Sequence, residues 1–372
     1  MLSIKRYQIS DLRLRIIKIT VSFFLAKRFF RFDGGAEVAT RQYIEALPTV
    51  FSDCHLLSEM NKLDYEGFSC NHLRVGWGTR SGRLESFGRK ARIAAQGGIL
   101  QAHEWIPGAQ VMRLGGGLHS VWAERGLALN GKYSRFHRKM ISLQDQTLTN
   151  PQLKLVIANS ELVANEVKER FPRISAEVVV IRNSIQPEFQ FSSLGLLHES
   201  GRLLFVGSGW RRKGLEFLIK AFKCLPDYYT LEVVGQDKEA RLYWKLARDI
   251  SVADRVHFRG AQRVEPSTYQ GVQCLIIPSL YDPFPNVALE ALSQGVPVVT
   301  SEFTGATDFN RDLGVCVSSL EPAALAKKIH ETTEFSVNDR RRISDYFRGF
   351  NTENLIAALR SAYSAVEIPV QR

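Results

Sequence analysis

The chain has 372 residues, of which 45% are hydrophobic and 23% are charged. This length favours two domains, each with its own core, and the composition excludes a largely disordered chain. The net charge of +11 indicates an anionic partner or substrate, a class that includes nucleic acid, acidic lipid surfaces and sugar nucleotides.

The N-terminal segment contains an apolar run, Ile16–Ala26, behind a basic leader that extends from Lys5 to Arg15. The run is too short to span a bilayer, carries Lys18 and has no small-residue cleavage site. We therefore predict a buried first strand and no transmembrane helix, so that any membrane contact is peripheral. Five dispersed cysteines without metal-ligand spacing predict reduced thiols and a cytoplasmic location.

Short apolar runs alternate with helix-length segments along the first half of the chain. Runs of about four to eight residues rich in Val, Ile and Leu are typical of strands that helices cover on both faces. The expected strands are Ile16–Phe24, Cys54–Ser58, Leu73–Trp77, Ile99–Ala102, Val111–Leu114, Leu153–Asn159 and Val178–Ile181.

The second half of the chain repeats this alternation. A helix is expected over Gly214–Leu225, where apolar residues form one stripe. Two such series predict an α/β protein with two Rossmann-like, doubly wound domains. The expected strands of the second series are Arg202–Gly207, Leu231–Gly235, Val256–Gly260, Cys274–Ser279 and Pro297–Thr300.

The domain boundary is expected in Gln186–Gly201, which contains Pro, Ser and Gly but no strand or helix rhythm. This places an N-terminal domain at residues 1–186 and a second domain at 187–338. Residues 339–372 are expected to be helical, with one amphipathic helix behind an Asn351–Thr352 cap, and to pack back on the N-terminal domain.

Ligands of doubly wound domains bind at the carboxyl ends of the strands, so the residues that follow each strand are site candidates. The strand that ends at Gly207 leads into a Gly-Ser-Gly turn and then into the cations Arg212 and Lys213. The turn would let the backbone approach a phosphate, and the cations would neutralise it. The alternative is a solvated basic turn that only caps a helix.

A second candidate follows the fourth strand of this series. Pro285 is expected in the first turn of a helix that starts near Phe284, so that Asn286 and Glu290 share one helix face. Together with Asp282, these groups could bind a sugar, a phosphate and a ribose. The alternative is an N-capping Asp282 and a surface Glu290.

Two glycine-rich segments of the first half are also candidates. Gly34 and Gly35 lie between the first strand and a helix, where paired glycines allow close approach to a ligand but also serve tight turns. Gly115–Gly117 precede His119, which could be either a positioned polar group or a structural histidine.

Together and in this order, these segments resemble the retaining, GT-B-fold glycosyltransferases of glycosyltransferase family four, and most of all the lipopolysaccharide core glucosyltransferases. The similarity is strongest from Leu203 to Phe309. In the first half it is carried by Phe32–Glu37, Pro107-Gly108 and Ile157–Ser160.

The resemblance implies a role for each matching residue. Arg212 and Lys213 would hold the donor diphosphate behind the turn at Gly207. Asp282 and Glu290 match the two acids of the family's Glu-x7-Glu motif, which contact the donor sugar and the ribose hydroxyls. Catalytic roles are thus expected for Asp282, Arg212, Lys213 and also His119.

The resemblance also implies further contacts with the donor. The amides of Asn286 and Val287 would face a phosphate, and Arg259 and Gly260 would lie near the base. Gly34 and Gly35 would lie beside the diphosphate from the opposite domain.

Two positions depart from the family pattern. Asp282 is one methylene shorter than the family's glutamate, and Gly116 stands where related sequences often have an aspartate before the histidine that matches His119. Either change could alter activity or acceptor choice.

The implied activity is the retaining transfer of a hexose from a nucleotide-diphosphate sugar, most simply a UDP-sugar, to a glycan or lipid-linked acceptor. The pathway would be the assembly of lipopolysaccharide core or another cell-surface polysaccharide. No Asp-x-Asp motif is present, so we expect no metal and no other cofactor, with Arg212 and Lys213 in the metal's place. The alternatives are a sugar-nucleotide epimerase on the same fold and a catalytically weakened sugar-nucleotide-binding protein.

The basic leader and Arg135–Lys139 belong to the half expected to bind the acceptor. Such clusters are attracted to anionic lipid surfaces, so we expect peripheral contact with the inner face of the cytoplasmic membrane. The alternative is a solvated basic face. No nucleic-acid recognition motif accompanies the positive charge, and we expect no nucleic-acid partner.

Overall fold

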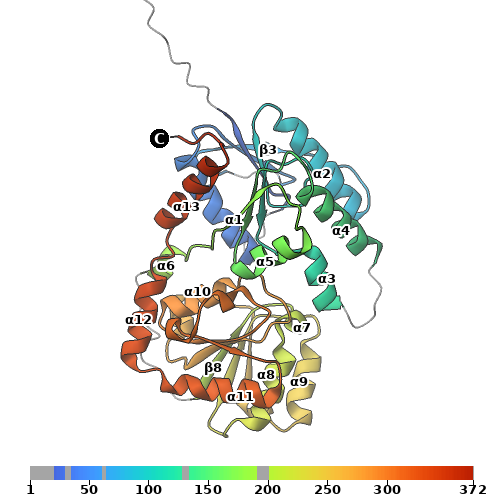
Figure 1. Ribbon diagram of the computed structural model, residues 1–372. Coiled ribbons are helices and arrows are strands. Elements are labelled where there is room, and N and C mark those ends of the chain that lie inside the picture. The colour runs from blue at the N-terminus through green and yellow to red at the C-terminus, as the bar shows by residue number, and fades with distance from the viewer. Residues whose placement is uncertain (1–20, 30–34, 61–63, 128–133, 191–200, 372) are drawn as a thin grey trace, which may run out of the picture.

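The computed structural model describes residues 21–29, 35–60, 64–127, 134–190 and 201–371. These residues form two β-sheets, each made of parallel strands, and one sheet lies above the other in Figure 1. The basic leader, Gly34 and most of the expected boundary segment lie outside the described residues. None of the described helices is long and apolar enough to cross a bilayer.

The first sheet has seven strands in the order β3-β2-β1-β4-β5-β6-β7, and all neighbours are parallel. Its strands β1, β5 and β6 are buried along their full length because helices cover both faces of the sheet. The strands are β1 (Phe23–Ala26), β2 (Cys54–Ser58), β3 (Phe68–His72), β4 (Ile99–Ala102), β5 (Val111–Leu114), β6 (Leu155–Ala158) and β7 (Glu177–Val180). The helices are α1 (Gly35–Ala46), α2 (Arg80–Ala94), α3 (His119–Leu127), α4 (Arg135–Leu148) and α5 (Glu161–Arg170).

Two strand predictions in this half were wrong in position. Among the described residues, the first strand begins at Phe23, and Val21 and Ser22 are not in a strand. The strand expected at Leu73–Trp77 is instead β3, whose sequence Phe-Ser-Cys-Asn-His is mostly exposed at the sheet edge. An edge strand needs no continuous apolar run, whereas Leu73 and Val75 pack as irregular chain against the core.

The second sheet has six parallel strands in the order β10-β9-β8-β11-β12-β13. Five were expected from the sequence, and β13 at the edge was not. The strands are β8 (Arg202–Val206), β9 (Thr230–Val234), β10 (Val256–Gly260), β11 (Cys274–Ile277), β12 (Val298–Ser301) and β13 (Val315–Ser318). The helices are α7 (Trp210–Lys213), α8 (Leu215–Ala221), α9 (Ala240–Asp249), α10 (Asn286–Ser293) and α11 (Pro322–Glu331), with short 3-10 turns such as η4 (Pro266–Tyr269) and η5 (Gly305–Asp308).

Two helix starts also differ from the sequence prediction. The helix expected at Gly214–Leu225 begins earlier, as α7, and is interrupted at Gly214, whose φ is +73°. A side chain there would also lie 1.8 Å from the carbonyl oxygen of Pro278, so only glycine fits. Helix α10 begins at Asn286, with Pro285 as its extended N-cap residue.

The C-terminal helices divide between the two sheets. Helix α12 (Val337–Phe347) packs with the core of the second sheet through Ile343 and Phe347. Helix α13 (Thr352–Ala365) packs with the core of the first sheet, where the Tyr363 hydroxyl donates to Gln101 Oε1 at 2.6 Å. The chain therefore passes between the sheets twice, once near α6 (Pro187–Gln190) and once before α13 (Figure 1).

Candidate functional site

The carboxyl ends of the two sheets meet at one junction. Ser160, directly after β6, donates its hydroxyl hydrogen bond to the carbonyl oxygen of Pro283 at 2.7 Å. The Tyr281 hydroxyl donates to Glu166 Oε2 of α5, also at 2.7 Å. A side chain at Gly117 would lie 2.1 Å from the Tyr281 hydroxyl. The glycine-rich loop of the first sheet therefore approaches the turn that carries Asp282.

The turn after β8 places two cations at this junction. Gly207 and Gly209 have φ values of +144° and +72°, which glycine adopts without strain. Asp237 Oδ2 accepts the backbone N–H of Trp210 at 2.7 Å, which fixes the start of α7 against the end of β9. As a result, Arg212 and Lys213 both reach Asp282.

Asp282 is the anionic centre of this cluster. Its side chain is only 9% exposed and forms an ion pair with Lys213, while Arg212 Nη1 lies 3.9 Å from Oδ2. Arg212 Nη1 also donates to the Tyr281 carbonyl oxygen at 2.9 Å. The alternative in which Asp282 caps the next helix is wrong, because the cap residue of α10 is Pro285.

The first turn of α10 faces the first sheet. Asn286 Nδ2 donates to the Gly35 carbonyl oxygen at 2.9 Å, and Asn183 Nδ2 donates to Asn286 Oδ1 at 2.6 Å. Gly35 at the start of α1 is thus next to the start of α10, with Val287 half-buried beside Asn286. Gly34 lies outside the described residues.

Glu290 lies one turn further into α10 and is buried, so the alternative of a surface glutamate is wrong. The Tyr269 hydroxyl donates to Glu290 Oε2 at 3.1 Å. Burial, with a smaller contribution from Glu188, raises the pKa of Glu290 to about 7. None of the described contacts joins Glu290 directly to the cluster of Arg212, Lys213 and Asp282.

His119 begins α3 and interacts with a second histidine. Its Nε2 lies 3.1 Å from His137 Nδ1, and its ring stacks on Trp122 and His137. Burial, followed by the charges of His137 and Arg80, lowers the pKa of His119 to about 4. His119 is therefore a neutral imidazole at pH 7, suited to a hydrogen bond with a neutral hydroxyl group.

Gly116, in the same loop, is exposed, and a side chain there would meet no atom within 4 Å. The space beside Gly116 could therefore hold an aspartate. The glycine at this position, where related sequences often have an aspartate, is therefore not explained by a lack of space.

Arg259 and Gly260 lie at the carboxyl end of β10. The Gly260 carbonyl oxygen accepts from Gly235 N at 2.8 Å, and Gly235 lies against Gly207, so this end adjoins the turn that leads to Arg212. Arg259 forms an ion pair with Glu232 and lines a hollow of about 770 Å³ between α9 and β10.

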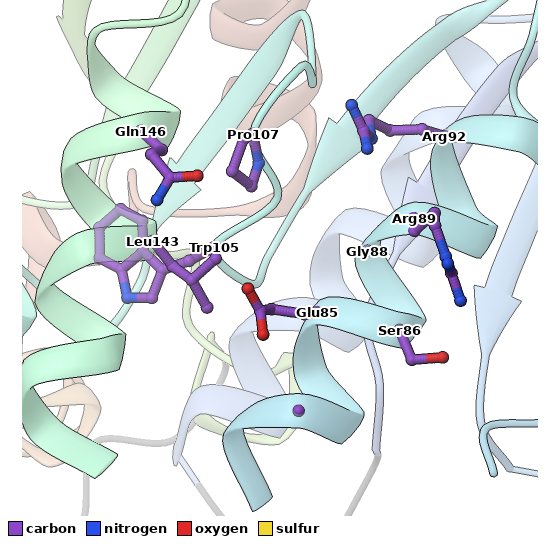
Figure 2. Close-up of a pocket in the computed structure, with 10 residues that line it drawn as sticks. Glu85, Ser86, Gly88, Arg89, Arg92, Trp105, Pro107, Leu143 and Gln146 are labelled. Carbon is purple, nitrogen blue, oxygen red and sulfur yellow. The ribbon is translucent and has the colours of Figure 1, made fainter. Parts of the chain in front are cut away.

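A second hollow, of about 460 Å³, lies between α2 and α4, where Trp105, Leu143 and Glu85 point into the space between the helices (Figure 2). The parallel connection from β4 to β5 contains no helix, so a loop with Trp105 and Pro107 covers this part of the sheet.

Among the described residues, no group of three or more His, Cys, Asp or Glu side chains could hold a metal ion.

Sequence reasoning missed three polar residues of the junction: Tyr281, Asn183 and Arg113. Asn183 follows β7 and Arg113 lies in β5, so the rule that singled out residues after strands could have found Asn183. No sequence pattern predicts a contact between Tyr281 and Glu166, because 115 residues separate them.

Comparison with known proteins finds a family match for the part of the chain that forms the second sheet. Residues 200–334 match the family "Glycosyl transferases group 1". This part of the chain is a group 1 glycosyl transferase domain. It contains all the expected donor residues of the second half: Gly207, Arg212, Lys213, Arg259, Gly260, Asp282, Asn286, Val287 and Glu290.

Sequence relatives agree with this assignment. The lipopolysaccharide core biosynthesis glycosyltransferase LpsE of Rhizobium meliloti is 36% identical over 110 residues, 30% of this chain and 32% of LpsE. The lipopolysaccharide glucosyltransferase WaaG of Escherichia coli is 31% identical over 132 residues, 34% of this chain and 35% of WaaG. Each of these sequence matches thus spans about a third of the relative's length.

Solved structures extend the similarity to both domains. The crystal structure of WaaG superposes with a TM-score of 0.70 at 18% identity, and covers 93% of this chain and 99% of WaaG. Anabaena HepE in complex with UDP and glucose gives a TM-score of 0.67 at 16% identity, over 93% of this chain and all of HepE. The GT-B fold expected from the sequence is confirmed, with the group 1 domain as its second half.

The raised pKa of Glu290 predicts a pH-dependent stability. Between the ordinary pKa of 4.5 and about 7, folded Glu290 holds a proton that the unfolded chain releases, so the free energy of unfolding falls as pH rises through this range. The fall due to this residue is up to about 3 kcal/mol. Glu290→Gln cannot titrate and should lack it.

Urea unfolding of both proteins at about pH 5 and about pH 7.5 measures this difference. Contributions from other titrating groups cancel when the two proteins are compared. Equal pH dependence in wild type and Glu290→Gln would show that Glu290 is ionised in the folded protein.

Proposed function

We propose that this protein is a retaining glycosyltransferase that moves a hexose from a nucleotide-diphosphate sugar to a glycan or lipid-linked acceptor. The observation that carries the proposal is the cluster of Arg212, Lys213 and Asp282 at the junction of two Rossmann-like sheets, within a group 1 domain. A UDP-sugar is the proposed donor, and the HepE complex with UDP and glucose, on a similar fold, supports this choice.

The proposed chemistry depends on stabilising the leaving diphosphate. Retention through a front-face, oxocarbenium-like step builds negative charge on the diphosphate as the glycosidic bond breaks. Arg212 and Lys213 are already held in place by Tyr281 and Asp282, so they need little reorganisation to meet this charge. Preorganised groups of this kind contribute about 3–4 kcal/mol each to transition-state stabilisation.

The remaining donor contacts follow from the same geometry. The first backbone N–H groups of α10, at Asn286 and Val287, have no acceptor within the helix and would bind a phosphate oxygen. Asp282 would accept sugar hydroxyl groups, and Glu290 would accept ribose hydroxyl groups once ionised. The neutral imidazole of His119 would hydrogen-bond to the sugar or the acceptor. We further propose that no divalent metal takes part, since two cations already meet the diphosphate.

Arg212→Gln should lower kcat/KM about 10²- to 10³-fold, because it removes one preorganised cation from the transition state. The melting temperature should change little, since the Arg212 side chain is one-third exposed. Steady-state kinetics and thermal unfolding measure the two effects.

Arg211→Gln is the matched control, because Arg211 is the exposed neighbour on the same turn. A normal rate for Arg212→Gln would remove this residue from the diphosphate site. Lys213 is a poorer test of catalysis, because its loss would leave the buried Asp282 carboxylate without its ion-pair partner.

A donor screen, with and without a lipid-linked glycan acceptor and scored for free nucleotide diphosphate, tests the reaction itself. Diphosphate release that needs acceptor, and that continues in excess EDTA, is expected. Donor conversion without acceptor would indicate an epimerase. Binding without conversion would indicate a sugar-nucleotide-binding protein, and loss of turnover in EDTA would contradict the metal-free mechanism.

We propose that the acceptor belongs to lipopolysaccharide core or another cell-surface polysaccharide, as the names of LpsE and WaaG suggest. In the first half, α2 and α4 carry four exposed arginines, namely Arg89, Arg92, Arg135 and Arg138. Each such cation contributes about 1 kcal/mol of attraction to an anionic lipid surface. The proposed location is therefore the inner face of the cytoplasmic membrane.

Co-sedimentation with vesicles tests this contact. Anionic vesicles should bind the protein, neutral vesicles should not, and high salt should abolish binding. The double variant Arg135→Gln and Arg138→Gln should bind more weakly than wild type. Equal binding to both kinds of vesicle would reject an electrostatic contact.

A further inference from the structure

A line of hydrogen bonds crosses the junction and returns, and it begins at two residues, Arg113 and Asn183, that the proposed donor contacts do not explain. Arg113 Nη2 in β5 donates to Asn183 Oδ1 at 2.6 Å. Asn183 Nδ2 donates to Asn286 Oδ1 at 2.6 Å, and Asn286 Nδ2 donates to the Gly35 carbonyl oxygen at 2.9 Å. The line thus joins the first sheet to α10 and α10 back to the start of α1.

Arg113 is an unusual residue at which to begin such a line. It is 4% exposed, and its guanidinium lies 4.6 Å from the ring centroid of Tyr43. It forms no ion pair with any carboxylate in the described parts of the chain, and its Nε lacks a hydrogen-bond partner there. A buried cation without a carboxylate is costly, so packing stability alone gives no reason for an arginine here.

The arginine fixes the direction of every later bond. A guanidinium can only donate hydrogen bonds, so Asn183 must turn its oxygen toward Arg113 and its nitrogen toward Asn286. Asn286 must then accept through Oδ1, which leaves its nitrogen to donate to Gly35. Without Arg113, either amide could rotate by half a turn and the bond to Gly35 would lose its donor.

We propose that Arg113 and Asn183 are positioning residues, which orient Asn286 so that its amide holds the Gly35 backbone. This contact, together with the others at the junction, fixes the arrangement in which the first turn of α10 and the start of α1 would meet the donor from opposite sides. The inference rests on the proposed function and adds to it the residues that hold α10 against α1 at the junction.

Asn183→Asp tests whether Asn183 must donate a hydrogen bond to Asn286. Aspartate has almost the same shape and gives Arg113 a carboxylate, but it cannot donate to Asn286. Stability should therefore be unchanged or higher, while kcat/KM for transfer falls about tenfold or more. A residue needed only for folding would lower stability and activity together. That result, or wild-type kcat/KM, would overturn the proposal.

Asn286→Ala provides a second variant, since Asn286 is only half-buried and its loss should not prevent folding. Asn338→Ala, at an exposed position of α12, is the matched control and should behave as wild type. Asn286→Ala and Asn183→Asp should both lower transfer activity, and both should loosen the junction.

The native cysteines allow the junction to be measured without turnover. Cys70 on the first sheet and Cys224 on the second domain are exposed, and the other three cysteines are buried. Spin labels on Cys70 and Cys224 should give a broader or shifted distance distribution in Asn183→Asp and Asn286→Ala than in wild type, with no ligand added.

An unchanged distance distribution in both variants would overturn the proposal, whatever their activity. The two proposals fail separately. If wild type transfers no sugar from any donor, the proposed function fails, whereas the distance measurement still decides whether Arg113 and Asn183 control the junction.

Discussion

The ion pair between Lys213 and Asp282 is the interaction on which the candidate site depends. An ionised carboxylate that is nearly buried is costly without a cation beside it. The pair of Asp282 with Lys213 removes this cost by joining the turn after β8 to the turn after β11. Each turn is held separately: Asp237 fixes the first through Trp210, and backbone bonds from Asp282 to Phe303 and Gly305 fix the second. The pair therefore forms within the second domain alone.

The first domain reaches this pair through polar contacts of a different kind. Ser160, Glu166 and Asn183 each bond to the segment Tyr281–Asn286. Each of these hydrogen bonds contributes about 1 kcal/mol. An ion pair between Arg182 and Asp308 and the burial of Tyr281 in the core of the first sheet add to them. The junction is therefore held by a set of specific contacts that is separate from the ion pair within the second domain.

The pKa values of Glu290 and His119 are shifted in opposite directions, which gives these two residues different charge states near neutral pH. Burial raises the pKa of Glu290 to about 7 and lowers the pKa of His119 to about 4. Glu290 is thus close to its midpoint at neutral pH and could gain its charge as a ligand binds, whereas His119 stays neutral. Arg212 and Lys213 are the cations that we propose to bind the donor diphosphate.

The sequence alone determined the two-sheet architecture and the turns that carry Arg212, Lys213, Asp282 and Glu290, because buried parallel strands and the residues after them are local patterns. Only the tertiary structure decided the polar edge strand β3, the burial of Glu290, and the contacts of Arg113, Asn183 and Tyr281. These depend on residues more than 70 positions apart in most cases, or on being at the edge of a sheet. The hydrophobic periodicity of a short segment contains no information on contacts between distant residues or on the position of a strand within its sheet.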